Sequence, residues 1–168
     1  MNKNIFNNDD MIELQNLLRE QKKTITVAES CTGGLIASLI TKVSGSSDIF
    51  NGSIVTYSNK IKNQELDVKN ETLESFGAVS IEVVSEMLDG VIKKFEADFA
   101  IAISGIAGPN GGTLRKPVGT VIIGICDIKY NKKVDIYTFN GTREEVQINA
   151  AKTSLKEFSK FLQNTLDK

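Results

Sequence analysis

The sequence of 168 residues contains no histidine and no tryptophan, and it has only two cysteines and two prolines. Without histidine, serine or cysteine chemistry needs another base, and a zinc site would need the less common carboxylate ligands, so we expect no metal and no cofactor. Cys31 and Cys126 are too few and too far apart for a disulfide framework. Reduced thiols in a cytoplasmic protein are the simpler interpretation.

An excess of charge of one sign is also missing, and so are long hydrophobic runs. Lys and Arg total 20 against 21 Asp and Glu, and the dispersed basic residues leave no footprint of nucleic-acid binding. No apolar segment is long enough for a signal peptide or a bilayer span. We therefore expect one domain over residues 1–168 that binds neither nucleic acid nor membrane, with residues 1–8 as a flexible N-terminal extension.

Apolar periodicity predicts helices and strands that follow one another along the chain. The expected helices are residues 11–21, 35–43 and 60–66, a long helix capped by Ser80, and a terminal helix that starts with a capping box at 142–145. The expected strands are residues 24–28, 53–57, 99–103 and 118–126, with a hairpin partner at 132–139. This order predicts a single-domain, three-layer α/β/α sandwich around a mixed central sheet, with functional loops at the carboxyl ends of central strands.

The most informative segment is residues 28–34, where a strand is followed by Ser30 and then by a glycine pair before a helix. Such a turn presents a nucleophile beside backbone N–H groups that hold an oxyanion or a phosphate. Spacing alone favours Ser30 as a helix cap, and Thr32 as cap would leave Ser30 free for chemistry. Cys31 is a rival nucleophile, but without histidine a buried small residue is the simpler expectation.

Lysine is the usual substitute for histidine in Ser–Lys hydrolases, and Lys60 and Lys62 follow the second expected strand. A lysine acts as a general base near neutral pH when burial or nearby positive charge lowers its pKa to about 7–8. Being two positions apart on a helix, these lysines point in different directions, so we expect one inside and one in solvent. Two solvated lysines are the commoner alternative. Tyr57 either relays a proton to the serine or is an interfacial aromatic.

A second candidate site is the loop at residues 104–113, which carries four glycines and one of the two prolines. Ordering so long a glycine-rich loop costs backbone entropy, which favours a functional role. The loop lacks the ending of a Walker motif and a dinucleotide fingerprint. Arg143 lies at the start of the terminal helix, where the helix dipole disfavours a cation. We expect a partner for it, either a substrate phosphate or a neighbouring acid.

Taken together, these segments resemble the CinA C-terminal domain family over nearly the whole chain, in its stand-alone form. The motifs that carry the resemblance are residues 28–34, 56–59 with Lys62, 77–80, 104–109 with Gly111 and Gly112, and 116–120. Such stand-alone members are nicotinamide-nucleotide amidases. The resemblance therefore implies metal-free hydrolysis of nicotinamide mononucleotide to nicotinate mononucleotide and ammonia, in pyridine nucleotide recycling.

The resemblance also implies roles for individual residues. By this resemblance, Ser30 takes the position of the family's nucleophile, Lys62 that of its general base and Tyr57 that of a supporting hydroxyl. The residues implied to bind substrate are Cys31, Thr32, Gly33, Gly34, Ser104, Gly105, Ala107, Gly108 and Arg143. Gln147 stands where the family often has a second arginine, four residues after Arg143.

Two other functions stay open from the sequence. The first is a catalytically silent nucleotide-binding or regulatory module of the competence-damage-inducible type, and the second is a Ser–Lys hydrolase of another small amide. As partners of the chain we expect a small-molecule nucleotide substrate and further copies of the chain in a homo-oligomer.

Overall fold

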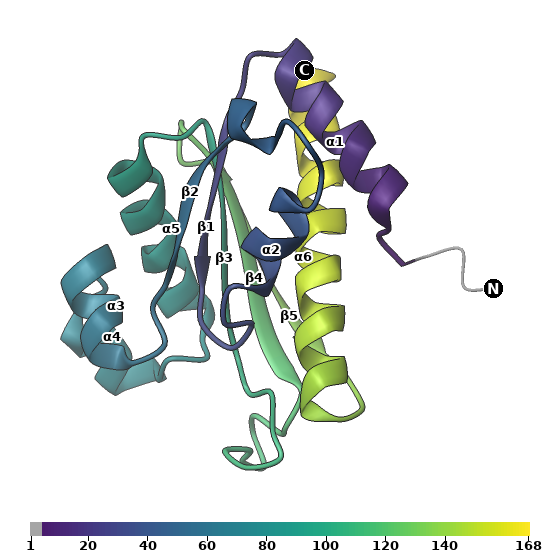
Figure 1. Cartoon of the computed structure of the whole chain (residues 1–168). Helices are drawn as coiled ribbons and strands as arrows, with labels where there is room; N and C mark the ends of the chain where they lie inside the picture. The colour runs from purple at the N-terminus through teal and green to yellow at the C-terminus, as the bar shows by residue number, and fades with distance from the viewer. Residues whose placement is uncertain (1–4) are drawn as a thin grey trace.

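The structure is a computed structural model that describes residues 5–168, and its centre is a five-stranded mixed sheet (Figure 1). The strands are β1 (Ile25–Glu29), β2 (Phe50–Val55), β3 (Phe99–Gly105), β4 (Thr120–Asp127) and β5 (Lys132–Thr138), in the order β2-β1-β3-β4-β5. β1 pairs in parallel with β2 and β3, whereas β4 is antiparallel to both of its neighbours. The carboxyl ends of β1, β2 and β3 therefore meet at one edge of the sheet.

Helices cover both faces of this sheet. On one face lie α1 (Asn8–Glu20), α2 (Leu35–Thr41) and α6 (Arg143–Leu166); on the other lie α3 (Asn59–Leu66), α4 (Asn70–Phe76) and α5 (Ile81–Phe95), and a short 3-10 turn, η1 (Ser46–Asp48), precedes β2. β3 contributes side chains to the hydrophobic core on each face of the sheet, because its successive side chains point to opposite faces. Ile101 belongs to the same core cluster as the α6 residue Phe158, and Ala102 belongs to the other cluster, with the α5 residue Leu88. The expected three-layer α/β/α fold is confirmed.

The expected elements are present with shifted ends, and one helix was missed. Ser80 caps α5, and Thr142 with Glu145 forms the expected capping box of α6. β2 starts three residues earlier than expected, at Phe50, and a register shift opposite β1 leaves Asn51 without a paired residue there. The seven-residue helix α4 was not expected; its one buried side chain is Leu73, so it shows no apolar period.

The N-terminal extension expected over residues 1–8 falls partly outside the described residues, which begin at residue 5. Phe6 is buried in the core beside α1. The Asn7 side chain accepts hydrogen bonds from the N–H groups of Asp9 and Asp10 and so caps α1. Residues 6–8 thus belong to the fold, and Asn7 is the cap of α1.

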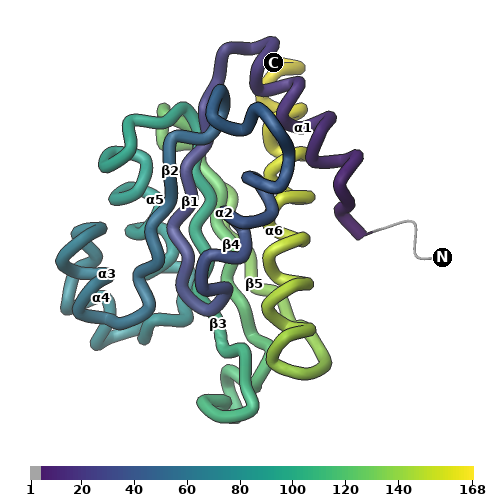
Figure 2. The backbone as a smooth tube through the Cα atoms, in the orientation of Figure 1, coloured from purple at the N-terminus to yellow at the C-terminus, as the bar shows by residue number. Residues whose placement is uncertain are grey.

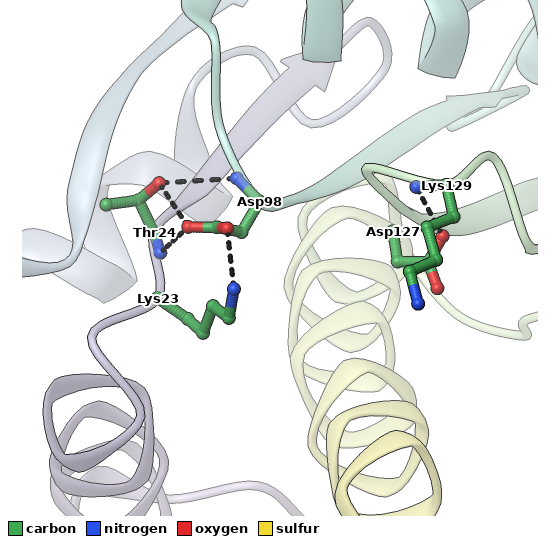
Figure 3. A network of polar contacts seen from close by, with 5 residues as sticks. All are labelled: Lys23, Thr24, Asp98, Asp127 and Lys129. Carbon is green, nitrogen blue, oxygen red and sulfur yellow. Dashed lines mark hydrogen bonds and ion pairs between the residues drawn. The ribbon is translucent and has the colours of Figure 1, made fainter.

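Polar contacts fix the amino ends of β1 and β3, away from their carboxyl ends (Figure 3). The Asp98 carboxylate accepts hydrogen bonds from Lys23 Nζ at 3.0 Å and from the Thr24 N–H at 3.0 Å. Burial raises the pKa of Asp98, but these donors and the Lys23 charge outweigh it and hold the pKa below its ordinary value. At the end of β4, Asp127 accepts from the Lys129 N–H at 2.9 Å. These bonds fix the strand register and leave the opposite edge of the sheet for the loops.

The segment between β3 and β4 extends beyond this opposite edge, beside the beginning of α6 (Figure 2). Its base continues the hairpin: the Ile106 N–H donates to the Thr120 carbonyl, and the Gly119 N–H donates to the Ile106 carbonyl, each at 2.8 Å. The loop is therefore a prolonged hairpin with a glycine-rich tip.

Candidate active site

Ser30 follows the last residue of β1, and backbone pairing brings the turn after β2 beside it. The Thr56 N–H donates to the Glu29 carbonyl at 2.8 Å, one step beyond the last residue of β2. α3 then begins behind its cap Ser58. Lys62 points inward from this helix with 1% of its surface exposed, whereas Lys60 is exposed. The expectation of one inward and one solvated lysine is confirmed.

Lys62 Nζ contacts Ser30 directly. It donates to Ser30 Oγ at 3.0 Å, to the Thr56 carbonyl at 2.7 Å and to the Tyr57 carbonyl at 3.4 Å. Burial lowers the pKa of Lys62 from 10.5 to about 8, although the nearby Cys31 acts in the opposite direction. In the neutral amine, two hydrogens stay on the two carbonyls and the lone pair faces Ser30 Oγ. This is the geometry of a general base beside its nucleophile.

The capping expectations for Ser30 and Thr32 are wrong. Glu29 supplies the cap instead: its fully buried carboxylate accepts hydrogen bonds from the N–H groups of Ile36 and Ala37, each at 3.0 Å. The Thr32 hydroxyl donates to the same carboxylate at 2.6 Å. Our sequence reasoning missed Glu29; an acid at the end of a buried strand, just before a helix, was the signal for it. Glu29 fixes the turn that carries Ser30.

Of the four residues that follow Ser30, only Cys31 lies at the edge of the Ser30–Lys62 site. Cys31 is buried at its edge, and burial raises the pKa of its thiol to about 12, with the Glu29 charge acting in the same direction. The thiol therefore stays protonated, as expected for a structural cysteine. Gln147 Nε2 donates to the Cys31 carbonyl at 2.9 Å. Gly33 and Gly34 have positive φ and form the turn, and the Thr32 hydroxyl is bonded to Glu29. Their expected part in substrate binding stays a prediction.

A cleft of about 260 Å³ opens beside Ser30 and Lys62 at the carboxyl edge of the sheet. It brings together nine of the expected residues: Ser30, Cys31, Tyr57, Lys62, Ser104, Gly105, Ala107, Gly108 and Arg143. Five further lining residues belong to segments named above but had been given no individual role: Ala78, Val79, Ile106, Asn110 and Gly111. Thr32, Gly33 and Gly34 are not part of its lining. The cleft thus joins both loops that the sequence analysis identified.

Arg143 connects the two sides of this cleft. Its Nη1 donates to the Gly108 carbonyl at 2.6 Å, and its Nη2 donates to the Tyr57 hydroxyl at 2.9 Å. The hydroxyl of Tyr57, whose side chain is 60% exposed, therefore contacts Arg143 and not Ser30. Within residues 5–168 Arg143 forms no ion pair, so the neighbouring acid considered above is absent there. Its other N–H groups are left for an anion.

The wall opposite the strand ends comes from the loop after β3. Ser104 is buried at the end of this strand, and a side chain at Gly105 would collide with Val121 and the Thr120 carbonyl, so only glycine fits. Across the described chain, the N–H groups of Ala107 and Gly108 donate to no protein acceptor. Both residues line the same cleft as Ser30. They are candidates to hold an oxyanion.

Two other kinds of site, a metal site and a membrane-spanning helix, are absent from residues 5–168. Nowhere in residues 5–168 do three or more His, Cys, Asp or Glu side chains gather so that they would hold a metal ion. None of the helices in this range is both long and apolar enough to cross a membrane.

The fold and the site together define a class: a single α/β domain whose cleft, at the carboxyl edge of a mixed sheet, carries a buried Ser–Lys pair. Comparison with protein families gives a specific assignment. Residues 9–162 match the CinA C-terminal domain, and the chain belongs to this family.

Curated relatives and solved structures agree with this assignment. The chain is 47% identical over 157 residues to a CinA-like protein of Thermotoga neapolitana, and 50% identical over 153 residues to one of Endomicrobium trichonymphae. These matches cover 92% and 89% of the chain but only 38% and 35% of the relatives, which are much longer proteins.

Two crystal structures show the same fold. Competence damage-inducible protein A of Klebsiella pneumoniae superposes with a TM-score of 0.89 at 33% identity, covering 93% of this chain and 96% of that one. Competence/damage inducible protein CihA of Agrobacterium tumefaciens gives 0.82 at 36% identity, covering 89% and 93%.

Proposed function

We propose that this chain is an amidohydrolase that converts nicotinamide mononucleotide to nicotinate mononucleotide and ammonia. The observation that carries the proposal is the buried Lys62 Nζ, 3.0 Å from Ser30 Oγ, with a pKa lowered to about 8. Membership of the CinA C-terminal domain family supports it, because the motifs of this chain resemble those of the family's stand-alone amidases. The names of the matched relatives state no activity, so the substrate rests on that resemblance and on the chemistry of the cleft.

In the first step, neutral Lys62 takes the proton of Ser30, and Ser30 Oγ attacks the carboxamide carbon of the substrate. A C–O bond forms, and the amide oxygen becomes an oxyanion. We assign the stabilisation of that oxyanion to the unpaired N–H groups of Ala107 and Gly108, two residues that line the cleft. Donors of this kind contribute about 3–4 kcal/mol to lowering the barrier in comparable sites.

In the second step, the tetrahedral intermediate collapses and the C–N bond breaks. The Lys62 ammonium returns its proton to the leaving nitrogen, and ammonia departs from a nicotinoyl ester on Ser30. Water then attacks the ester while Lys62 takes a proton from it. Lys62 hands this proton back to Ser30 Oγ as the acid leaves, so the site ends as it began.

Arg143 gives the reason for a nucleotide substrate. Two contacts, to Gly108 and Tyr57, orient its guanidinium at the N-terminus of α6, and its other N–H groups are available to the 5′-phosphate. The helix dipole favours an anion at this position. Binding energy from the phosphate, remote from the reacting amide, then positions the carboxamide at Ser30.

The test is turnover by the purified chain in the presence of a chelator. Nicotinamide mononucleotide should yield ammonia and nicotinate mononucleotide in equal amounts, and the riboside, which lacks the phosphate, should react poorly. Thermal stabilisation by the mononucleotide without product would instead favour a nucleotide-binding module. Faster turnover of the riboside or of another small amide would favour a different amidase.

A further inference from the structure

Two motifs of the sequence have no part in the chemistry above: residues 77–80 and residues 116–120. The first follows α4 and supplies Ala78 and Val79 to the cleft lining. The second closes the glycine-rich loop, whose residues 106–108, 110 and 111 also line the cleft. Arg143 holds this loop on the side of α6, through the Gly108 carbonyl. On the side of α4 the loop is held by a different side chain.

Lys116 makes that second contact. Its Nζ donates to the carbonyl of Phe76, the last residue of α4, at 2.8 Å. A helix C-terminus leaves carbonyl groups without partners and carries partial negative charge, so an ammonium group is well suited to this position. The next residue, Gly77, has a positive φ of 76°, and a Cβ built there would lie 3.8 Å from the same Nζ.

Both ends of this contact are rigidly attached to a part of the cleft wall. In the loop, the Lys116 N–H donates to Thr113 Oγ1 at 3.0 Å, and the Thr113 N–H donates back to the Lys116 carbonyl at 2.8 Å. Beyond α4, Ser80 Oγ donates to the Gly77 carbonyl at 2.8 Å and caps α5. Residues 78 and 79 lie between these two fixed points. A change at Lys116 therefore reaches both motifs.

We propose that Lys116 is a positioning residue that ties the glycine-rich loop to the end of α4 and so sets the spacing of the cleft walls for substrate binding. Lys116 does not line the cleft and acts only through the Phe76 carbonyl. The tie itself is inferred from these contacts alone, whereas its effect on the binding of a mononucleotide rests on the proposed function. Since the loop carries four glycines between residues 104 and 113, freeing it multiplies the conformations that substrate must order.

The experiment compares Lys116→Met with its neighbour Arg115→Met and with Lys116→Arg. Arg115 is exposed and, among residues 5–168, has no hydrogen bond or ion pair, so it controls for loss of one loop charge. Hydrogen exchange over residues 106–119 reports the tie without any substrate. Steady-state kinetics with nicotinamide mononucleotide reports its use.

Lys116→Met should exchange faster over residues 106–119, raise KM about fivefold and leave kcat within about twofold. Arg115→Met should match the unchanged protein, and Lys116→Arg should restore KM to within about twofold, because its guanidinium also donates to a carbonyl.

Unchanged exchange in Lys116→Met would overturn the tie. Faster exchange with an unchanged KM would overturn its role in substrate binding. If the unchanged chain shows no turnover but exchange separates the variants as described, the tie stands and the proposed function fails.

Discussion

Turnover should rise with pH as Lys62 loses its proton, and this rise can be predicted in size. The neutral amine is the active form, because only its lone pair can accept the Ser30 proton. With a pKa of about 8, roughly one tenth of the molecules carry neutral Lys62 at pH 7. An unshifted lysine, at 10.5, would be neutral in only about 3 of 10,000 molecules at that pH. Burial thus increases the active fraction about 300-fold.

The two pKa values predict different profiles. A lysine titrating near 8 gives a rise of about tenfold in kcat/KM between pH 7 and pH 9.5, followed by a plateau. A lysine titrating at 10.5 gives a rise of about 300-fold over the same range, with no plateau. The difference is large enough to read from initial rates.

The assay is ammonia release from nicotinamide mononucleotide at low substrate concentration, from pH 6 to pH 10. Circular dichroism at each pH confirms that the protein is folded. The substrate phosphate is fully ionised above about pH 7, so it adds no titration on the alkaline side. A rate that is flat from pH 6 upward, or that rises steadily to pH 10, would refute Lys62 as the base in the state that burial gives it.

Three other variants test the packing around the site. The unchanged protein should gain stability relative to Lys62→Met by up to about 3 kcal/mol of unfolding free energy between pH 7 and pH 10.5, because above pH 8 unfolded Lys62 keeps a proton that folded Lys62 has lost. Denaturant titrations of both proteins at the two pH values test the sign. Glu29→Gln should lower the free energy of unfolding by about 1–3 kcal/mol and should affect kcat more than KM, because its amide group cannot accept all three hydrogen bonds that fix the Ser30 turn. A kcat equal to that of the unchanged protein would argue against this role. Gly90→Ala should lower the free energy of unfolding by about 1–3 kcal/mol, measured by denaturant unfolding, because its Cβ would collide with the Leu66 carbonyl of α3. An unchanged unfolding midpoint would contradict that close packing.

Elements with a strong local signal could be predicted from the sequence. The apolar run 99–103 is a central strand covered on both faces, and Ser80 and Thr142 cap the helices expected to follow them. Position on a helix also predicted that one of Lys60 and Lys62 would point inward. These features depend on residues within one or two turns of each other. Local periodicity and capping chemistry suffice for them.

Contacts between distant segments could not be predicted in this way. Ser30 and Lys62 are 32 positions apart, and their meeting depends on how β1 pairs with β2. Tyr57 meets Arg143 across 86 positions, which gave its hydroxyl a partner other than the expected one. The resemblance to a family identified Ser30 and Lys62 as partners, because a family's motifs indicate which distant positions meet in the fold, and sequence spacing alone does not. The expected homo-oligomer stays a prediction.

In the proposed mechanism, Ser30 and Lys62 act together as nucleophile and base. The most direct measurement is ammonia release from nicotinamide mononucleotide, with chelator present, by the unchanged chain, Ser30→Ala and Lys62→Met, each shown to be folded. We expect turnover by the unchanged chain and a loss of at least about 1,000-fold in either variant, because the two groups act as a unit. Turnover that persists in either variant at the level of the unchanged chain would contradict it.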